Sequence, residues 1–580
     1  MKKQLLALLL TSTMCAGMLA GCGGSVEGAA GSGAASGQTG KVEQSGEPAG
    51  SEGASEADYT EKLKLTAWVH TDDNEHGYLT GTNENPVVSY IMDQFNVDFE
   101  WQLPPLGSEA EQMNLMIGSG DYTDVFDTSY CQQTKEELYE DGVIYDLTPY
   151  AEQYLPNYLA YLKEHETVAK QVYSEDGKLL FVASIENEPA VSWGGLVYDR
   201  NILVKMTDDN VQFPSGNEEP KTVADWEYML ELMKRHFEAS GLTEYACLIL
   251  PYNGYFTGDL VNGFGASGTT YVEDGVVKHG MYEKEFYNYI AKMKEWYEKG
   301  YIYQDFASRS SDPFYFPNTA LTYGGAAGIF YGLVGQLGGN MNNPEYGWEF
   351  DYRALTAPID EENGAELLPA NGMVANSMSN AVQGGGWVVS TACSEEKLIR
   401  WLQICDWLYT EEGSMMKSYG LTKEQAEGNA VYERHGLQDG AYWFDENGEF
   451  VYNPVLAPNV GANAGMEQEI RIARWPGLYN RTYYNASNDP AILEADKIWV
   501  SNGYSACIPM GVKLTSEESQ LLAPLNTAIN DYVDSMIPQF IMGKEPLTEE
   551  SFEAFVQQMK ALGSDTVVET WQAAYDRYME

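Results

Sequence analysis

Every second residue is apolar in two short stretches of the chain, at 63–69 and 97–101. This alternation predicts β-strands, because successive side chains of a strand point to opposite faces of its sheet. Residues 86–95 and 108–120 have the apolar spacing of short helices, and residues 125–126 predict a third strand. The order strand, helix, strand, helix, strand predicts a parallel sheet with helices on both faces.

A second set of strands and helices follows along the chain. Its predicted strands are 179–183, 195–198, 245–250, 325–330 and 386–390. Its predicted helices are 222–239, 284–299, a helix that begins at Ser394 and a C-terminal helix at 548–562. Trp226 and Trp401 recur at helical spacing with other apolar residues, so we expect both in the core. The strands and helices of this set between residues 179 and 299 predict a second α/β lobe.

The N-terminus has the layout of a bacterial secretory signal. Two lysines precede an apolar run at residues 5–10, and the small residues Ala20 and Gly21 precede Cys22. The run is too short for a membrane-spanning helix, which needs about 20 apolar residues. We therefore expect residues 1–21 to be removed as a signal peptide and the Cys22 thiol to carry a diacylglyceryl membrane anchor. Residues 22–57, without an aromatic residue, predict a disordered linker.

Charge and composition exclude further classes of protein. The 86 acidic residues outnumber the 34 basic residues and give a formal net charge of -52. Such a charge repels a phosphate backbone, so we expect no nucleic-acid partner. With 44% hydrophobic and 13% aromatic residues, the chain after the linker is expected to be globular.

Cysteine, histidine and acidic spacing give no sign of a metal or cofactor. The five cysteines beyond Cys22 are far apart and lack CxxC spacing, so we expect buried thiols, with one or two disulfides as the alternative. The six histidines show neither HxH nor HExxH spacing. Residues 445–448 resemble part of a calcium loop but lack its distal glutamate, and predict a hairpin turn instead. We expect no metal and no cofactor.

Seven stretches, in a fixed order, carry a family resemblance: MNLMIGSGDYTDVF (113–126), GVIYDLTPYAEQYLPNY (142–158), GGLVYDRNIL (194–203), TVADWEYMLELMK (222–234), MKEWYEKGYIYQDF (293–306), GGWVVSTACSEEKLIRWLQICDWLYTEEG (385–413) and FEAFVQQMKALGSDTVVETWQAAYDRY (552–578). They resemble the extracellular solute-binding proteins of carbohydrate ABC transporters, family 1, most closely the LplA-like lipoproteins. Thr123 departs from the pattern, because the family commonly has proline before this aspartate.

The resemblance implies an α/β fold of two hinge-linked lobes, the type II arrangement of periplasmic binding proteins, with mixed sheets flanked by helices. Residues 58–190 and 357–413 are assigned to the first lobe, and residues 191–356 and 414–580 to the second. Crossings between lobes are expected near residues 188–193, near residues 354–358 and after Gly413.

The resemblance also implies a function without catalysis. A lipid-anchored monomer on the outer face of the cell membrane would capture a carbohydrate, specifically an oligosaccharide, and deliver it to an ABC transporter permease. Closure of the lobes links binding to transport, since only the closed form is expected to dock productively. The long tethered form resembles lipoproteins of Gram-positive bacteria.

A sugar site needs carboxylates or amides for hydroxyl groups and aromatic rings for apolar C–H faces. Such groups converge at the carboxyl ends of parallel strands. Asp127 and Tyr130 follow the strand at 125–126, in a loop that carries ligand contacts in the family. Packing in the core, or helix capping by Asp127, is the alternative role. The predicted ligand contacts are Trp68, Asp72, Asp127, Tyr130, Trp193, Tyr255, Phe256, Tyr331, Trp387 and Trp475.

Two other functions are compatible with the sequence. A secreted glycoside hydrolase would need two carboxylates about 5 to 10 Å apart across a cleft, and 86 acidic residues guarantee some such pair by abundance alone. The same fold could instead serve as a sensor domain or bind a peptide, a modified amine or another solute that is not a sugar. Hydrolysis of a bound oligosaccharide would identify the enzyme, and ligand screening would separate sugar from peptide receptors.

Overall fold

A computed structural model describes residues 61–70, 82–187, 191–250, 258–308, 321–322, 324–339, 349–370, 372–456, 466, 469–488 and 490–580. The predicted signal peptide, Cys22, the linker, Asp72, Tyr255 and Phe256 lie outside the described residues. In the described part of the chain, no helix has the length and apolar character needed to cross a membrane.

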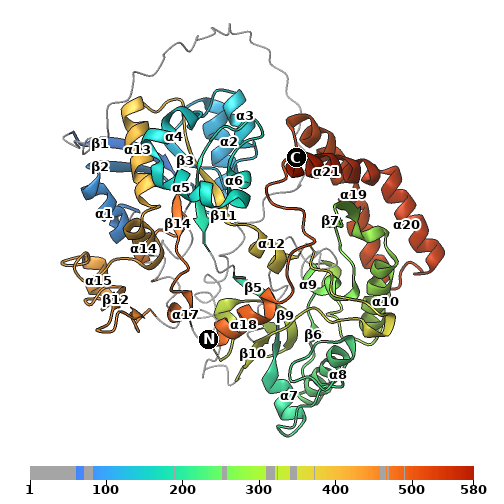
Figure 1. Cartoon of the computed structure of the whole chain (residues 1–580). Coiled ribbons are helices and arrows are strands. Elements are labelled where there is room, and N and C mark those ends of the chain that lie inside the picture. The colour runs from blue at the N-terminus through green and yellow to red at the C-terminus, as the bar shows by residue number, and fades with distance from the viewer. Residues whose placement is uncertain are drawn as a thin grey trace.

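The first lobe is built on a six-stranded mixed sheet (Figure 1). Strand β1 pairs in parallel with β2 and β3, as the strand–helix alternation predicts, and β14 pairs in parallel with β4. Strand β11 returns between β3 and β4 and is antiparallel to both. In sheet order the strands are β14 (Gly477–Tyr479), β4 (Val182–Glu186), β11 (Val382–Val389), β3 (Val125–Asp127), β1 (Leu63–Trp68) and β2 (Val97–Gln102).

Nine described helices belong to this lobe. They are α1 (Pro86–Gln94), α2 (Glu109–Ser119), α3 (Lys135–Glu140), α4 (Thr148–Tyr154), α5 (Pro156–Glu164), α6 (Glu166–Val172), α13 (Glu395–Trp407), α14 (Glu411–Tyr419) and α15 (Ala430–Arg434). Trp401 of α13 is fully buried, and its ring centroid lies 5.2 Å from that of Trp387 in β11. The predicted core position of Trp401 is confirmed.

The second lobe is built on a four-stranded sheet in the order β10 (Tyr352–Ala354), β5 (Gly194–Asp199), β9 (Ala327–Leu333) and β6 (Ala246–Leu248). Its main helices are α7 (Arg200–Met206), α8 (Val223–Ala239), α9 (Gly258–Val261), α10 (Lys284–Glu298), α12 (Met373–Ser379) and α18 (Pro490–Val500). Trp226 of α8 is fully buried and stacks on Trp296 of α10 at 6.2 Å, which confirms its predicted core position.

Three C-terminal helices, α19 (Ser516–Ile541), α20 (Glu549–Ala561) and α21 (Ser564–Met579), flank the second lobe (Figure 1). Helix α19 packs against α10, and apolar residues of all three helices join the core of this lobe. A small hairpin of β7 (Thr270–Glu273) and β8 (Val276–His279) packs against α21.

The chain passes between the two sheets three times. The first crossing, between β4 and β5, lies at the predicted position. The second lies between α12 and β11 instead of near residues 354–358, because backbone hydrogen bonds such as Leu355 to Leu196 hold that segment on the second lobe. The third follows β14 and leads through α17 (Tyr484–Ser487) to α18, instead of following Gly413.

The residues from Met415 to β14 lie in the first lobe, and not in the second lobe to which they are predicted to belong. Helix α14 packs against β14, and apolar residues from Met415 to Trp475 lie in the same core as β1. This region includes β12 (Tyr442–Phe444) and β13 (Phe450–Tyr452), which form the predicted hairpin. Asp445 accepts hydrogen bonds from the backbone of Asn447 and Glu449 in its turn.

All five cysteines beyond Cys22 are unpaired. Cys131 is half-buried, and the other four, Cys247, Cys393, Cys405 and Cys507, are buried. The predicted buried thiols are therefore confirmed for four of the five positions, and the disulfide alternative is not realised in this structure. Burial raises the pKa of Cys247, Cys393 and Cys507 to about 12, so these thiols stay protonated at neutral pH.

Candidate functional site

A small cavity of about 180 Å³ lies at one edge of the first-lobe sheet. Strands β1, β3, β4 and β14 run in the same direction, so their carboxyl ends meet there, together with the start of β11. The charged and amide side chains that line the cavity are His70, Asp127, Glu186, Gln383, Arg474 and Arg481. This edge collects hydrogen-bonding groups from segments that are far apart in sequence.

Asp127, at the end of β3, is the centre of one polar chain. Its side chain is buried, and Oδ1 accepts hydrogen bonds from the backbone N–H and the hydroxyl of Ser129 at 3.0 and 2.8 Å. Oδ2 lies 3.0 Å from Nδ1 of His70, and Nε2 of His70 lies 2.8 Å from Nη1 of Arg474. A guanidinium only donates hydrogen bonds, so Nε2 is the acceptor and the proton of a neutral His70 sits on Nδ1, facing Asp127.

This chain sets the charge of Asp127. Burial by itself would raise its pKa, but the interactions with His70 and Ser129 outweigh burial and hold the pKa below the ordinary value. Asp127 is therefore a carboxylate at neutral pH. A charged acceptor in a fixed orientation suits recognition of a ligand hydroxyl group.

Three consecutive glycines of β11 bring bare backbone to this edge. A Cβ atom on Gly385 would lie 2.2 Å from the backbone nitrogen of Ser129, and one on Gly386 would lie 2.3 Å from the ring of Phe181. Gly386 also has a φ of +81°, which favours glycine. The loop after β3 can contact β11 closely only because these positions carry no side chain. The Thr128 hydroxyl donates to the Gly385 and Gly386 carbonyls at 2.5 and 3.0 Å.

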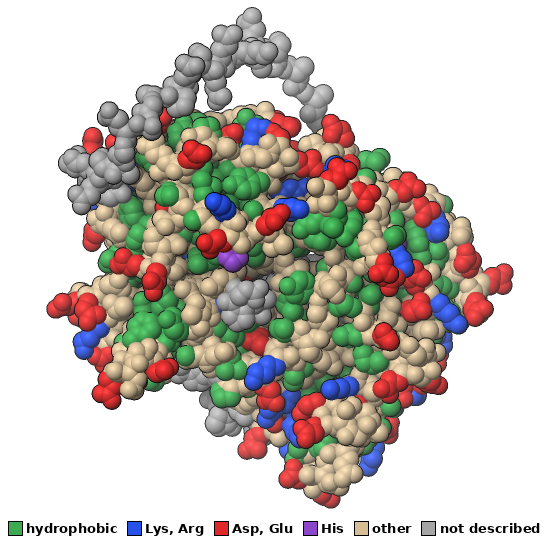
Figure 2. All heavy atoms as spheres, viewed as in Figure 1, with side chains coloured by type: hydrophobic (Ala, Val, Ile, Leu, Met, Phe, Trp, Pro, Cys, Tyr) green, Lys and Arg blue, Asp and Glu red, His purple; other side chains and the backbone are tan. Residues whose placement is uncertain are grey.

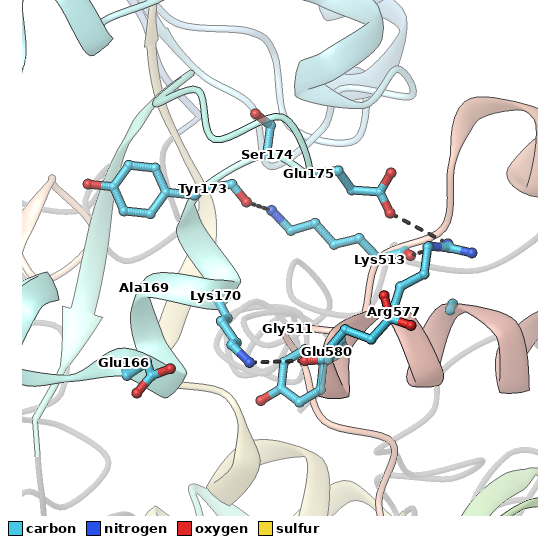
Figure 3. A pocket seen from close by; sticks show the side chains of 12 residues that line it. Glu166, Ala169, Lys170, Tyr173, Ser174, Glu175, Gly511, Lys513, Arg577 and Glu580 are labelled. Carbon is cyan, nitrogen blue, oxygen red and sulfur yellow. Dashed lines mark hydrogen bonds and ion pairs between the residues drawn. The ribbon is translucent and has the colours of Figure 1, made fainter.

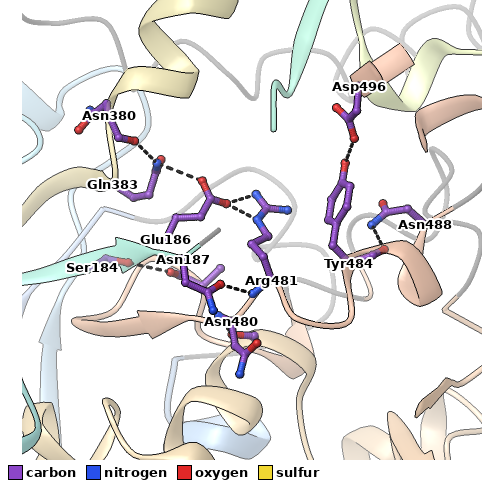
Figure 4. A network of polar contacts seen from close by, with 12 residues as sticks. Ser184, Glu186, Asn187, Asn380, Gln383, Asn480, Arg481, Tyr484, Asn488 and Asp496 are labelled. Carbon is purple, nitrogen blue, oxygen red and sulfur yellow. Dashed lines mark hydrogen bonds and ion pairs between the residues drawn. The ribbon is translucent and has the colours of Figure 1, made fainter. Parts of the chain in front are cut away.

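A second polar chain runs toward the third crossing (Figure 4). Arg481 forms an ion pair with Glu186 at the end of β4, and its backbone N–H donates to Asn187. Gln383 donates to the other oxygen of Glu186 at 3.2 Å. The Arg481 guanidinium also lies over the rings of Tyr479 and Tyr484, at 4.8 and 5.0 Å. One guanidinium thus connects the first-lobe sheet with the segment that leads into the second lobe.

Lys417 of α14 lies beneath this edge and has no exposed surface. Its Nζ donates to the Ala473 carbonyl at 2.6 Å and to the Ser184 hydroxyl at 3.1 Å, and lies 5.1 Å from the centre of the Tyr479 ring. Burial lowers the pKa of Lys417 to about 7. The amine therefore anchors β4 and the segment before β14 from below.

A larger groove of about 840 Å³ adjoins the cavity. Gly384 and Gly385 line both spaces. On one side the groove is lined by the first lobe, from α3, Phe181 and the start of β11. On the other side it is lined by Met510 to Ser519 and Trp571, which lie before α19, at its start and on α21. The two spaces together form a cleft that both lobes line.

No protein-family model and no curated protein sequence matches the chain. Several solved structures match the chain in fold. An alginate-binding protein, AlgQ2, superposes with a TM-score of 0.63 at 18% identity and covers 89% of this chain and 98% of its own. An extracellular solute-binding protein from Bifidobacterium longum subsp. infantis gives 0.67 at 16% identity, covering 90% and 99%. The Streptococcus pneumoniae ABC-transporter substrate-binding protein FusA, in complex with kestose, gives 0.64 at 16%, covering 89% and 99%.

The chain has the two-lobed solute-binding-protein fold. At these identities the likeness establishes the fold, as the sequence analysis predicts. The polar edge of the first-lobe sheet lines the cleft between the two lobes.

Of the predicted contacts, the structure places Asp127 in the lining of the cavity, whereas Tyr130 lines neither the cavity nor the groove. The Tyr130 ring meets His70 edge-on at 4.8 Å. Four other predicted contacts lie in the cores, with at most 5% of their surface exposed: Trp68, Tyr331, Trp387 and Trp475. Trp387 and Trp475 pack on each other and on Trp401. Their packing supports the alternative core role.

Trp193 lies at the first crossing and is half-buried. Its carbonyl accepts a hydrogen bond from the backbone of Val334 at the end of β9, and its side chain packs against the second-lobe core. Trp193 directly precedes β5 and lines neither the cavity nor the groove. Its ligand role stays a prediction. The contribution of Asp72, Tyr255 and Phe256 stays untested, since they lie outside the described residues.

Four residues that line the cavity are not among the predicted contacts: His70, Glu186, Arg474 and Arg481. His70 follows a predicted strand directly, which is a signal that could have found it. Glu186 was missed because β4 extends to residue 186 and not to 183. The two arginines flank β14, whose three residues are too few to show alternation. Only pairing of β14 with β4 brings them to the cleft.

The outer rim of the cleft is bridged by ion pairs and hydrogen bonds (Figure 3). Arg577 of α21 binds Glu518 through two hydrogen bonds of 2.8 and 2.6 Å and reaches Glu175 of the first lobe at 3.5 Å. The Lys513 amine contacts the Tyr173 carbonyl, and the Lys170 amine donates to the Tyr578 carbonyl at 2.9 Å. Separation of the two lobes would have to break the contacts of Arg577 with Glu175, of Lys513 with Tyr173 and of Lys170 with Tyr578.

We expect Arg577→Ala to shift the ligand-free protein toward open forms. The Arg577 side chain is partly exposed, so the lost pairing is worth only about 0.2–1 kcal/mol, up to roughly a fivefold change in the closed-to-open ratio. Small-angle X-ray scattering should report a larger radius of gyration at low salt. Lys560→Ala, which removes a pair confined to the C-terminal helices, is the control. Identical scattering curves for wild type and Arg577→Ala would contradict the prediction.

Proposed function

We propose that this protein binds an oligosaccharide in the cleft and delivers it to an ABC transporter permease. The observation that carries the proposal is the Arg474–His70–Asp127 chain beside the bare backbone of Gly384 to Gly386. It offers a cationic donor, a charged acceptor and close backbone approach at one edge. Neighbouring hydroxyl groups of a sugar need such donors and acceptors.

The fold supports the proposal without deciding the ligand. FusA, one of the structural neighbours, is described in complex with kestose, and another neighbour from Bifidobacterium longum infantis is described as binding HMO. Both are described as associated with ABC transporters. We extend this role to the present chain, and place it with the LplA-like lipoproteins on the sequence resemblance.

The arrangement of carboxylates favours binding over hydrolysis. A glycoside hydrolase needs one carboxylic acid whose pKa is raised so that it can protonate the leaving group. The pKa of Asp127 is lowered, and Glu186 is held by Arg481 and Gln383. Asp127 therefore does not have the environment of a general acid, and the two carboxylate oxygens of Glu186 already contact Arg481 and Gln383. We therefore propose a receptor without catalytic activity.

The membrane anchor is part of the proposal. Lipidation at Cys22 would hold the protein on the outer face of the cell membrane, with residues 22–57 as a tether to the permease. Expression of the full chain in a Gram-positive host, followed by membrane fractionation, tests this. Wild type should sediment with membranes, and Cys22→Ala should be released into the soluble fraction or remain unprocessed. Equal membrane retention of both would contradict lipid anchoring at this residue.

Ligand binding is tested by a thermal-shift screen of the folded chain against monosaccharides, oligosaccharides and peptides. A ligand that binds only the native state raises the melting temperature, by an amount that grows with its concentration relative to Kd. Hits are then measured by calorimetry. Stabilisation by sugars and not by peptides would support the proposal, and stabilisation by peptides alone would overturn it.

Asp127→Asn should weaken binding of the best sugar about 10- to 100-fold. Asparagine has the same shape but offers no charged acceptor, and a hydrogen bond to a charged group is worth about 1.5–3 kcal/mol. Calorimetry measures the change in Kd. Asp439→Asn, which alters an exposed aspartate of the same lobe, is the matched control. An unchanged Kd for Asp127→Asn, with the fold intact by circular dichroism, would remove Asp127 from the site.

A further inference from the structure

The cleft has two compartments that share one wall. The cavity beside Asp127 is about 180 Å³, which is small for a ligand site, and the adjoining groove is about 840 Å³. Gly384 and Gly385 belong to the lining of both. Because glycine has no side chain, nothing projects from these two positions to separate the compartments.

The groove carries an aromatic ring on each lobe. Tyr139 of α3 and Trp571 of α21 both line it, and both are half-buried. Trp571 packs against the second-lobe core and Tyr139 against the first-lobe core, and Lys178 lies 5.3 Å from the Tyr139 ring centre. A partly exposed ring held by packing on one side is a fixed platform for an apolar C–H face.

The charge of the groove restricts the ligand further. Six carboxylates line it, against three lysines, Lys135, Lys178 and Lys513. Lys178 is paired with Asp176, and Lys513 contacts the Tyr173 carbonyl. In the cavity the charges of Asp127 and Glu186 are balanced by Arg474 and Arg481. An anionic chain would meet net repulsion in the groove, whereas a neutral one would not.

We propose that the groove between Tyr139 and Trp571 is a second binding compartment, which takes the body of a neutral, linear oligosaccharide whose end unit sits in the cavity beside Asp127. This inference rests on the proposed function and deepens it. It assigns the segment from Met510 to Ser519 and α21 as the second lobe's share of the binding site. It also predicts that chains longer than two units are the preferred ligands.

The test is a chain-length series on the full folded domain. Neutral linear sugars of the malto-, cello-, xylo- and fructo-oligosaccharide series, from one to six units, and an oligouronate of four units are titrated by calorimetry. In the series that binds, affinity should rise at least about tenfold from the disaccharide to the tetrasaccharide. The oligouronate should bind more weakly than the neutral tetramer of the binding series.

Variants then locate the compartment. Trp571→Ala should lower the ratio of tetrasaccharide to disaccharide affinity about tenfold, and Trp571→Phe should restore most of it, because a ring is kept. Tyr532→Ala removes a half-buried aromatic residue of α19 that lines neither compartment and is the matched control. If Trp571→Ala fails to fold, Tyr139→Ala on the other lobe carries the same expectation.

The outcomes separate this inference from the proposed function. Disaccharides that bind as tightly as tetrasaccharides, or a ratio that neither Trp571→Ala nor Tyr139→Ala changes, would overturn the second compartment while leaving sugar binding intact. Tight binding of the oligouronate in preference to all neutral chains would overturn the charge assignment. Absence of binding to every sugar would refute the proposed function itself.

Discussion

Between pH 8 and 9.5, Lys417 should make the stability of the wild-type protein rise by about 1.4 kcal/mol per pH unit, and Lys417→Met should abolish this rise. Burial lowers the pKa of Lys417 to about 7, whereas an exposed lysine in the unfolded chain titrates near 10.5. In this window the unfolded chain binds one more proton at this residue than the folded protein does. Stability therefore increases with pH until the unfolded lysine also loses its proton.

Urea unfolding at pH 7, 8, 9 and 9.5 measures the slope for both proteins. The slope of unfolding free energy against pH is compared between wild type and variant, because the other titrating groups contribute equally to the slope of both proteins. Lys423→Met, which removes an exposed lysine of the same lobe, should leave the wild-type slope unchanged. Parallel curves for wild type and Lys417→Met would mean that Lys417 remains charged in the folded protein at alkaline pH.

Much of the fold could be predicted from the sequence because its long elements have clear periodicity. Helices α8, α10 and α20 lie within a residue of their predicted bounds, since a continuous apolar face defines each of them locally and a capping box begins α8 and α20. The crossings were harder to predict. The segment from Leu355 to Ala370 is held on the second lobe by long-range hydrogen bonds that no local pattern shows.

The site was less predictable for a related reason. An aromatic residue beside a strand end is equally suited to a core or to a sugar platform, and pattern alone does not separate the two. Trp387 and Trp475 illustrate this, because each is covered by other rings that come from distant segments. The position of Asp127 at the cavity could be predicted because it ends β3, a strand of the parallel part of the sheet, where the strand ends converge. Arg474 and Trp571 reach the cleft only through tertiary packing.

Gly385→Ala is expected to destabilise the protein by roughly 2 to 5 kcal/mol and to weaken sugar binding at the same time. The new Cβ would lie 2.2 Å from the Ser129 nitrogen and 2.3 Å from the Thr128 carbonyl carbon. These are backbone atoms, so relief requires the loop after β3 to move. The movement would break the hydrogen bond that the Thr128 hydroxyl donates to the Gly385 carbonyl and the one that the Gly385 N–H donates to Ser129 Oγ. It would also displace Asp127 from its contact with His70.

Urea unfolding and calorimetric titration of the same preparation measure both effects of Gly385→Ala. Gly118→Ala is the matched control, because Gly118 lies in α2 with nothing within 4 Å of a new Cβ, and alanine there should be neutral or stabilising by about 0.4–1 kcal/mol. If Gly385→Ala has the same urea midpoint and the same Kd as the wild type, the loop after β3 tolerates displacement. If Gly385→Ala lowers the stability but leaves Kd unchanged, the Asp127 loop contributes no ligand contact. Movement of this loop can weaken binding only if the loop forms part of the binding site.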